Sequence, residues 1–152
     1  MSPCDASPLR DLLRRALALA EGPAPYATDG QPLRSAASVY ARMRHLADLG
    51  EERLYVLALD VKHHVLEEVE VAHGSVASLS LTPADIFRPL VRLGASAGIL
   101  VHNHPSGDPT PSAEDRSLTR RLIECGALLG CPILDHVVVA RGGFESIMET
   151  AR

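Results

Sequence analysis

The chain has 152 residues, of which 46% are hydrophobic and 3% aromatic, so we expect a folded domain with an aliphatic core and not a disordered chain. A net charge of −4 argues against non-specific binding to nucleic acids, which requires a basic surface. No apolar run is long enough for a membrane span, and Asp5 and Arg10 interrupt the segment where a signal peptide would lie, so the cytoplasm is the expected location.

The beginning of the chain is predicted to be helical. Apolar residues recur at helical spacing over residues 7–21. Residues 22–34 are rich in glycine and proline, which is typical of a loop or linker. A second amphipathic helix is expected over residues 35–49. We therefore divide the chain into an N-terminal helix and linker, residues 1–31, and a main domain, residues 32–152.

A hairpin and a helix are predicted in the middle of the chain. Residues 54–59 form an apolar run of strand length, and residues 65–71 alternate apolar and acidic side chains, which is typical of a half-exposed strand. Residues 60–63 can form the turn between them. The segment 82–85 places a capping threonine before a proline and an acid, a pattern that starts helices. We expect this helix to end near Leu93.

The last third of the chain alternates strands and helices. Residues 97–102 predict a buried strand, and residues 103–111 are a loop rich in proline and glycine. A helix is expected over residues 112–129, followed by strands over residues 133–140 and 144–148. The resulting order is two strands, a helix, a strand, a helix and two strands. This order predicts a mixed α/β architecture.

Two histidines and an aspartate surround the proline-rich loop. His102 and His104 are two residues apart in an extended segment, so their rings point to the same side, and Pro105 favours an extended backbone at His104. Asp115 follows in the first turn of the helix that Ser112 can cap, where the helix dipole favours a carboxylate. The pattern H-x-H-P-x6-S-x2-D therefore brings two imidazoles and one carboxylate together.

Two imidazoles and one carboxylate can hold a zinc ion and leave the fourth tetrahedral position open, which is typical of catalytic zinc sites. Zn²⁺ is therefore the expected cofactor, and a metal-dependent hydrolase is the expected class of protein. Such an enzyme also needs a proton acceptor near the metal. The residues themselves leave this choice open among five glutamates: Glu51, Glu52, Glu67, Glu68 and Glu70.

The motif and its surroundings resemble a known family. The segment HNHPSGDPTPSAED follows the strand AGILV, and LALD at residues 57–60 and LTPADIF at residues 81–87 match the same group. Over about residues 32–150 the chain resembles the RadC-like branch of the JAB/MPN domains, whose metal motif is called JAMM. The resemblance implies an α/β fold of the JAB/MPN, cytidine-deaminase-like kind: a mixed curved sheet flanked by helices, here with an N-terminal helical extension.

The resemblance also implies roles for individual residues. It carries three zinc ligands over to this chain: His102, His104 and Asp115. Ser112 matches the serine that orients or stabilises the oxygen of the tetrahedral intermediate, and Glu52 matches the general base, with Glu51 as its rival. The implied reaction is hydrolysis of a peptide or isopeptide amide bond. A protein or peptide is therefore the expected substrate; the oligomeric state stays open, with a homodimer as one option.

Several alternatives stand beside this interpretation. A zinc-containing interaction module without catalytic activity, linked to DNA repair or mobile elements, is the alternative from another class. Asn103 stands where eukaryotic-type enzymes carry Ser or Thr, which is normal for the RadC-like branch. A second metal site at Cys125, Cys131 and His136 is disfavoured because free cysteines are often simply buried. Asp135 is a candidate for a residue that orients a metal ligand from outside the site.

Overall fold

The computed structural model describes residues 30–74 and 81–150, and the helix predicted over residues 7–21 lies outside the described residues. The strands are β1 (Arg53–Leu59), β2 (Val65–His73), β3 (Ala97–Asn103), β4 (Ile133–Ala140) and β5 (Gly143–Ser146). The helices are α2 (Ala36–Met43), the 3-10 helix η1 (Arg44–Asp48), α3 (Pro83–Arg92), α4 (Ala113–Leu129) and α5 (Ile147–Thr150). None of the described helices is long and apolar enough to cross a membrane.

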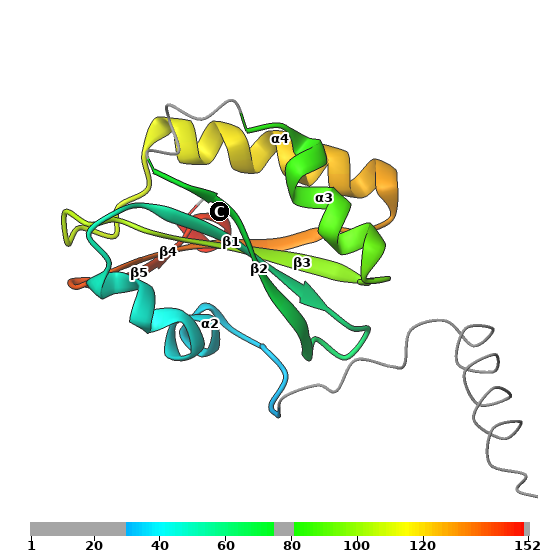
Figure 1. Cartoon of the computed structure of the whole chain (residues 1–152), viewed down its shortest axis with the longest axis horizontal. Helices are drawn as coiled ribbons and strands as arrows, with labels where there is room; N and C mark the ends of the chain where they lie inside the picture. The colour runs from blue at the N-terminus through cyan, green and yellow to red at the C-terminus, as the bar shows by residue number, and fades with distance from the viewer. Residues whose placement is uncertain (1–29, 75–80, 151–152) are drawn as a thin grey trace, which may run out of the picture.

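The five strands form one mixed sheet in the order β2-β1-β3-β4-β5. β1 pairs antiparallel with both β2 and β3, and β4 pairs antiparallel with β5. β3 and β4 are parallel, and α4 makes the long crossover that a parallel pair requires. Helices α3 and α4 cover one face of the sheet, and α2 covers the other (Figure 1). The predicted α/β architecture of a mixed sheet flanked by helices is confirmed.

β3 is the central strand of the sheet, and all seven of its residues are buried. Helices on both faces explain why its sequence is an unbroken apolar run and not an alternation. Ile99 and Val101 join the core cluster that packs against α2, whereas Leu100 joins the cluster beneath α3 and α4. Because side chains alternate along a strand, His102 points to the same face as Leu100. The first metal-site histidine therefore lies beneath the helical layer that contains α4.

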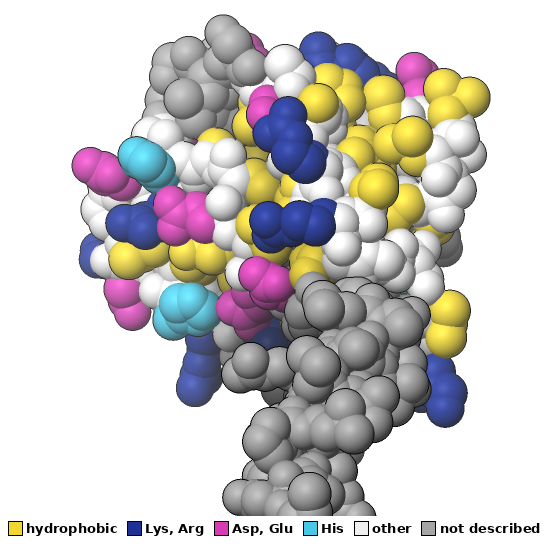
Figure 2. Space-filling view, turned by 45° about the vertical axis from the view of Figure 1, so that its right-hand side comes forward, with side chains coloured by type: hydrophobic (Ala, Val, Ile, Leu, Met, Phe, Trp, Pro, Cys, Tyr) yellow, Lys and Arg dark blue, Asp and Glu magenta, His cyan; other side chains and the backbone are white. Residues whose placement is uncertain are grey.

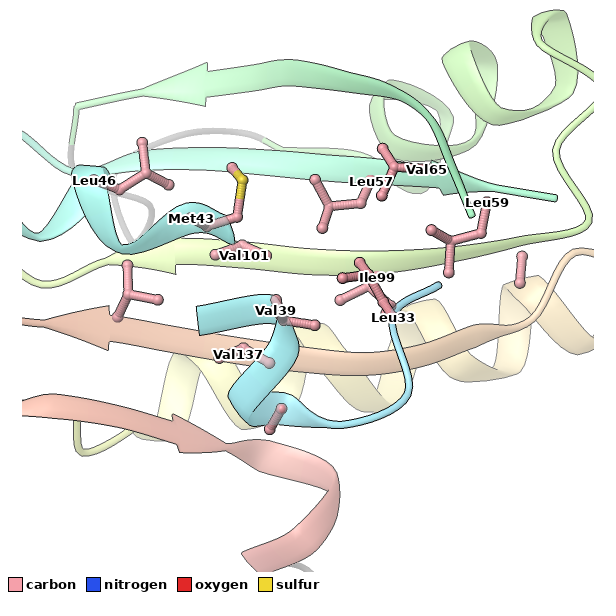
Figure 3. Close-up of a cluster of buried hydrophobic side chains, with 13 residues drawn as sticks. Leu33, Val39, Met43, Leu46, Leu57, Leu59, Val65, Ile99, Val101 and Val137 are labelled. Atoms are coloured by element: carbon pink, nitrogen blue, oxygen red, sulfur yellow. The ribbon is translucent and has the colours of Figure 1, made fainter. Parts of the chain in front are cut away.

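The helix predicted over residues 35–49 is an α-helix followed by a 3-10 helix. α2 ends at Met43, and η1 continues to Asp48. Three residues per turn bring side chains three positions apart onto one side of a 3-10 helix. Met43 and Leu46 are three apart, and both point into the core between α2 and the sheet (Figure 3). Residues three positions apart also share one side of an α-helix, so the apolar spacing alone does not distinguish the two kinds of helix.

The strand predicted over residues 144–148 ends earlier than expected. β5 ends at Ser146, and the next four residues form the helical turn α5. Ser146 Oγ accepts a hydrogen bond of 3.1 Å from the backbone N–H of Glu149. This contact caps the helical turn, and serine followed three residues later by glutamate is a known capping pattern. The prediction was wrong here because Ser146 caps a helical turn that the apolar residues alone do not indicate.

Candidate metal centre

Three side chains converge where β3 ends and α4 begins. His102 belongs to β3, His104 follows it in the loop, and Asp115 lies in the first turn of α4. Their ligand atoms all lie within 4.8 Å of one another, and His102 and Asp115 are buried. No other group of three or more such side chains was found in residues 30–74 and 81–150. This cluster can bind a metal ion.

The spacing of the ligand atoms suits a tetrahedral metal ion. His102 Nε2 and His104 Nε2 each lie 3.3 Å from Asp115 Oδ2, and they lie 2.9 Å from each other. Ligands bound to zinc at about 2.0–2.1 Å in a tetrahedral arrangement are separated by about 3.3 Å. Two of the three separations match this value, and the third is a few tenths of an ångström shorter. A small shift of one imidazole completes the fit.

The hydrogen bonds of His104 show which of its nitrogens is available. His104 Nδ1 lies 2.9 Å from the backbone carbonyl oxygen of Asp108. A carbonyl oxygen only accepts, so Nδ1 carries the proton, and Nε2 of the neutral ring keeps a lone pair. This lone pair faces His102 and the carboxylate of Asp115. Such a set of acceptors favours a positive charge at its centre.

The pKa values of the cluster show the same preference. Burial alone would raise the pKa of the Asp115 carboxyl, but its contacts with His102 and His104 outweigh burial and hold that pKa far below its usual range. Contact with Asp115 raises the pKa of His104 despite partial burial. Both shifts mean that a cation between the imidazoles and the carboxylate is stabilised. A proton and a metal ion therefore compete for this position.

Ser112 and Asp115 form a capping box that orients the carboxylate. Ser112 Oγ accepts a 3.1 Å hydrogen bond from the Asp115 backbone N–H, and the Ser112 backbone N–H donates a 2.8 Å bond to Asp115 Oδ2. The same Oδ2 atom faces both histidines. Ser112 is itself exposed, and a hydroxyl that accepts a hydrogen bond still has a proton to donate. It therefore has the chemistry for both orienting Asp115 and contacting a substrate.

The loop between the ligands is held by backbone contacts. His104 N–H donates to Val139 O at 2.9 Å, which ties the loop to β4. Gly142, in the turn between β4 and β5, donates its N–H to Gly107 O, also at 2.9 Å. A Cβ atom on Gly142 would lie 2.6 Å from that oxygen, so only glycine allows this approach. The β4–β5 turn therefore supports the metal-site loop from outside.

Register between β1 and β3 distinguishes Glu52 from Glu51. Leu54 pairs with His102 in these antiparallel strands, so two further residues of the same register place Glu52 opposite His104. Cross-strand partners point to the same face, and the next residue, Glu51, points away. The charge of Glu52 also contributes to the raised pKa of His104. Glu52 is half-buried beside the centre, whereas Glu51 is exposed.

Asn103 connects this glutamate segment to the metal-binding strand. Its side chain is fully buried and accepts a 2.7 Å hydrogen bond from the Arg53 backbone N–H. It also donates a 2.9 Å bond to the backbone carbonyl of Glu51. Glu52 lies between these two contacts, so Asn103 fixes the backbone on both sides of it. The residue between the two histidines therefore holds the segment that carries the expected base.

The acidic residues of β2 lie elsewhere. Glu70 is paired across the sheet with Tyr55 and bonds to Tyr55 and Arg53 on the α2 face. Glu68 forms an ion pair with Arg42. Neither carboxylate is brought to the histidines, because alternation along β2 directs both to the opposite face of the sheet. Glu67 is exposed on the edge strand, where it pairs with Ala58 near the end of β1 that lies away from Glu52.

Two further polar residues contact the centre and were not singled out by the sequence in this role. His136 Nε2 lies 2.7 Å from His102 Nδ1, and Thr119 Oγ1 lies 2.6 Å from His136 Nδ1. Burial lowers the pKa of His136 well below its usual value, so the ring is neutral. Asp135 instead accepts hydrogen bonds from the His136 backbone N–H and from Ser146 Oγ. The residue that contacts the second ring nitrogen of His102 is therefore His136 and not Asp135.

The comparisons with known proteins identify the family of this chain. The family model described as RadC-like JAB domain matches residues 33–152. A UPF0758 protein of Symbiobacterium thermophilum is 43% identical over 104 residues, which make up 68% of this chain and 44% of that protein. UPF0758 proteins of Syntrophotalea carbinolica and Thermotoga maritima are 41% and 42% identical over 121 and 119 residues. These alignments cover 79% and 78% of this chain, and 53% and 54% of the relatives.

The chain thus spans about half the length of the curated relatives that it matches. The family match nevertheless covers the whole sheet, its flanking helices and the three residues of the metal centre. It confirms the resemblance carried by the H-x-H-P-x6-S-x2-D motif, and the five-stranded mixed sheet has the architecture expected of a JAB fold. The chain therefore belongs to the RadC-like JAB domain family.

Proposed function

We propose that this protein is a zinc-dependent hydrolase of the JAMM type that cleaves a peptide or isopeptide amide bond. The observation that carries the proposal is the convergence of two imidazoles and one carboxylate beside Glu52, the residue that precedes β1. Three protein ligands leave one tetrahedral position open. A donor set with two nitrogens favours zinc over magnesium or calcium, which prefer oxygen ligands.

A zinc ion held by His102, His104 and Asp115 would act as a Lewis acid and make a water molecule acidic near neutral pH. Glu52 accepts a proton from the attacking water at its carboxylate and delivers it to the leaving nitrogen. The Asn103 side chain, bonded to the backbone of Glu51 and Arg53, keeps Glu52 beside His104 during the proton transfer. Ser112 donates its hydroxyl proton to the substrate oxygen as that oxygen gains negative charge.

We propose a protein or peptide as the substrate and the cytoplasm as the place of action. The net charge of −4 does not suit a polyanionic nucleic acid. On the face drawn in Figure 2, basic and acidic side chains lie side by side, with hydrophobic side chains between them. This mixed surface provides no continuous basic area on that face. It is compatible with a polypeptide, whose recognition does not depend on one sign of charge.

The proposal is tested by measuring bound zinc and amide cleavage in the same preparations. Wild type is expected to bind one zinc ion and to cleave members of a diverse peptide library. His104→Ala should lose both properties because it removes a ligand. Glu52→Gln should keep the zinc and lower the turnover by about 10²–10⁴-fold, because it removes only the proton acceptor.

Glu51→Gln is the matched control, since its carboxylate is exposed and one residue away from the proposed base. It should leave both zinc content and cleavage near the wild-type values. A wild-type protein without stoichiometric zinc would contradict the proposal. Zinc-loaded protein that cleaves no peptide in the library would point instead to an interaction module that retains its metal.

A further inference from the structure

A buried chain of polar groups connects the metal ligands behind the centre. His102 Nδ1 lies 2.7 Å from His136 Nε2, and His136 Nδ1 lies 2.6 Å from Thr119 Oγ1. Thr119 Oγ1 donates a 2.7 Å hydrogen bond to the backbone carbonyl of Asp115. His136 and Thr119 are 0% and 1% exposed. These buried hydrogen bonds therefore connect a ligand on β3, through a residue of β4, to the helical turn of α4 that carries another ligand.

Each hydrogen bond in this series of buried polar groups can be assigned a donor and an acceptor. The Thr119 hydroxyl has one proton, which it donates to Asp115 O, so its oxygen accepts from His136 Nδ1. A neutral His136 ring with a proton on Nδ1 offers a lone pair at Nε2. His102 Nδ1 then donates to that lone pair. The remaining nitrogen, His102 Nε2, is left without a proton and faces the metal position.

We propose that His136 and Thr119 are positioning residues that hold His102 in the Nδ1–H tautomer and so prepare the site before a metal binds. The other tautomer would place a proton on Nε2, where the metal must lie. A metal-binding histidine usually donates its second N–H to a carboxylate, a backbone carbonyl or water. Here a second histidine takes that place, and a threonine hydroxyl sets the orientation of its ring nitrogens.

Strand geometry supports this assignment. His136 pairs with Leu100 across the parallel strands β3 and β4, so it lies diagonally beside His102 on the α3/α4 face. Thr119 lies one helical turn after Asp115 on α4, and both side chains are buried. The two positioning residues thus come from the strand and the helix that enclose the site. The inference rests on the metal centre of the proposed function.

The first test compares Thr119→Val with Thr119→Ser in the full chain. Valine removes the hydroxyl with little change in shape, whereas serine keeps it. Zinc affinity, measured by competition with a chromophoric chelator, should fall by about tenfold or more in the valine variant and stay near wild type in the serine variant. Equal affinities in wild type and Thr119→Val would overturn the proposal.

The second test measures the tautomers directly in metal-free protein by ¹⁵N NMR of the histidine rings. His102 and His136 should both carry their proton on Nδ1 in wild type and in Thr119→Ser. Both rings should show mixed tautomers in Thr119→Val, because His136 has lost the acceptor that directs it. A wild-type His102 protonated on Nε2 would contradict the inference.

A third comparison separates hydrogen bonding from folding at His136. A glutamine amide can place an oxygen near the position of the ring Nε2, whereas an asparagine amide is too short to reach His102. His136→Asn should weaken zinc binding by about 10- to 100-fold, and His136→Gln should recover part of that loss. Equal losses would count against the His102–His136 hydrogen bond. A wild type that binds no zinc would refute the proposed function, but the NMR result would still decide the tautomer.

Discussion

The two faces of the central sheet bury different kinds of side chain. The α2 face is closed by an apolar cluster in which α2 and η1 pack on the strands (Figure 3). The α3/α4 face has an apolar cluster of its own, but it also buries four connected polar residues: His102, Asp115, Thr119 and His136. The other buried polar residues among those described, Asn103 and Ser146, each end a strand.

This difference predicts different responses to substitution on the two faces. An apolar cluster stabilises the fold through the area and volume that it buries, and exchanges of similar volume are tolerated. Buried polar groups cost free energy unless each one is hydrogen-bonded, so they do not tolerate replacement of one partner. The connected polar network lies on the face that carries the candidate metal centre. Substitutions on the two faces should separate metal binding from stability.

Among the comparisons between the two faces, the largest effect on metal binding is expected from Asp115→Asn. The amide preserves the shape of the side chain but removes the negative charge that faces both histidines. Zinc affinity should fall by more than about 100-fold. That is the upper end of the loss caused by removing a residue that only hydrogen-bonds to a ligand. Chelator competition measures the affinity, and circular dichroism checks that the fold is kept. Glu114→Gln, one residue earlier and exposed, is the control; an equal loss there would mean that only net charge matters.

The largest effect on stability is expected on the opposite face, from Met43→Ala. Met43 is completely buried between η1, α2 and the sheet (Figure 3). Its truncation should lower the free energy of unfolding by about 2–5 kcal/mol, because it leaves a cavity in a packed core. Urea denaturation measures this change. The folded variant should bind zinc as wild type does, and a parallel loss of zinc affinity would show that the faces are not independent.

An intermediate effect on both properties is expected from Asn103→Ala. The change leaves the Arg53 N–H and the Glu51 carbonyl without their buried partner. Stability should fall by about 1–3 kcal/mol. Amide cleavage should fall further than zinc affinity, because the segment that carries Glu52 is released while the three ligands remain. Unchanged turnover in a folded, zinc-loaded variant would show that Asn103 does not position the base.

The smallest effect is expected at the exposed edge of the α2 face, from Glu70→Gln. Hydrogen bonding from Tyr55, together with Arg53, lowers the pKa of Glu70 in the folded protein below its usual 4.5. A lowered pKa stabilises the fold at pH values above the ordinary pKa, and this stabilisation disappears as pH falls through the lower one. The difference in unfolding free energy from wild type should be at most about 1 kcal/mol at pH 7. It should vanish in acid, and a difference that grew on acidification would refute this account.

Much of the metal centre could be predicted because its parts are local. His102 and His104 share one extended segment, and the Ser112 cap starts the helix whose first turn carries Asp115. Strand alternation and helix capping act over a few residues, so spacing is enough to place all three ligand side chains. The same local rules located the five strands and the helices of the described domain. They failed at η1, where the apolar spacing suits either kind of helix, and at α5, where Ser146 caps a helical turn.

Sequence by itself determined which two histidines and which aspartate form the candidate metal centre, the α/β class and the likeness to RadC-like JAB domains. Only the tertiary structure decided which glutamate lies beside the ligands, because that depends on the register between β1 and β3, some fifty residues apart in the chain. It also decided that His136 and Thr119, rather than Asp135, stand behind His102. Contacts of this kind arise from strand order and helix packing, and no short pattern of residues encodes them.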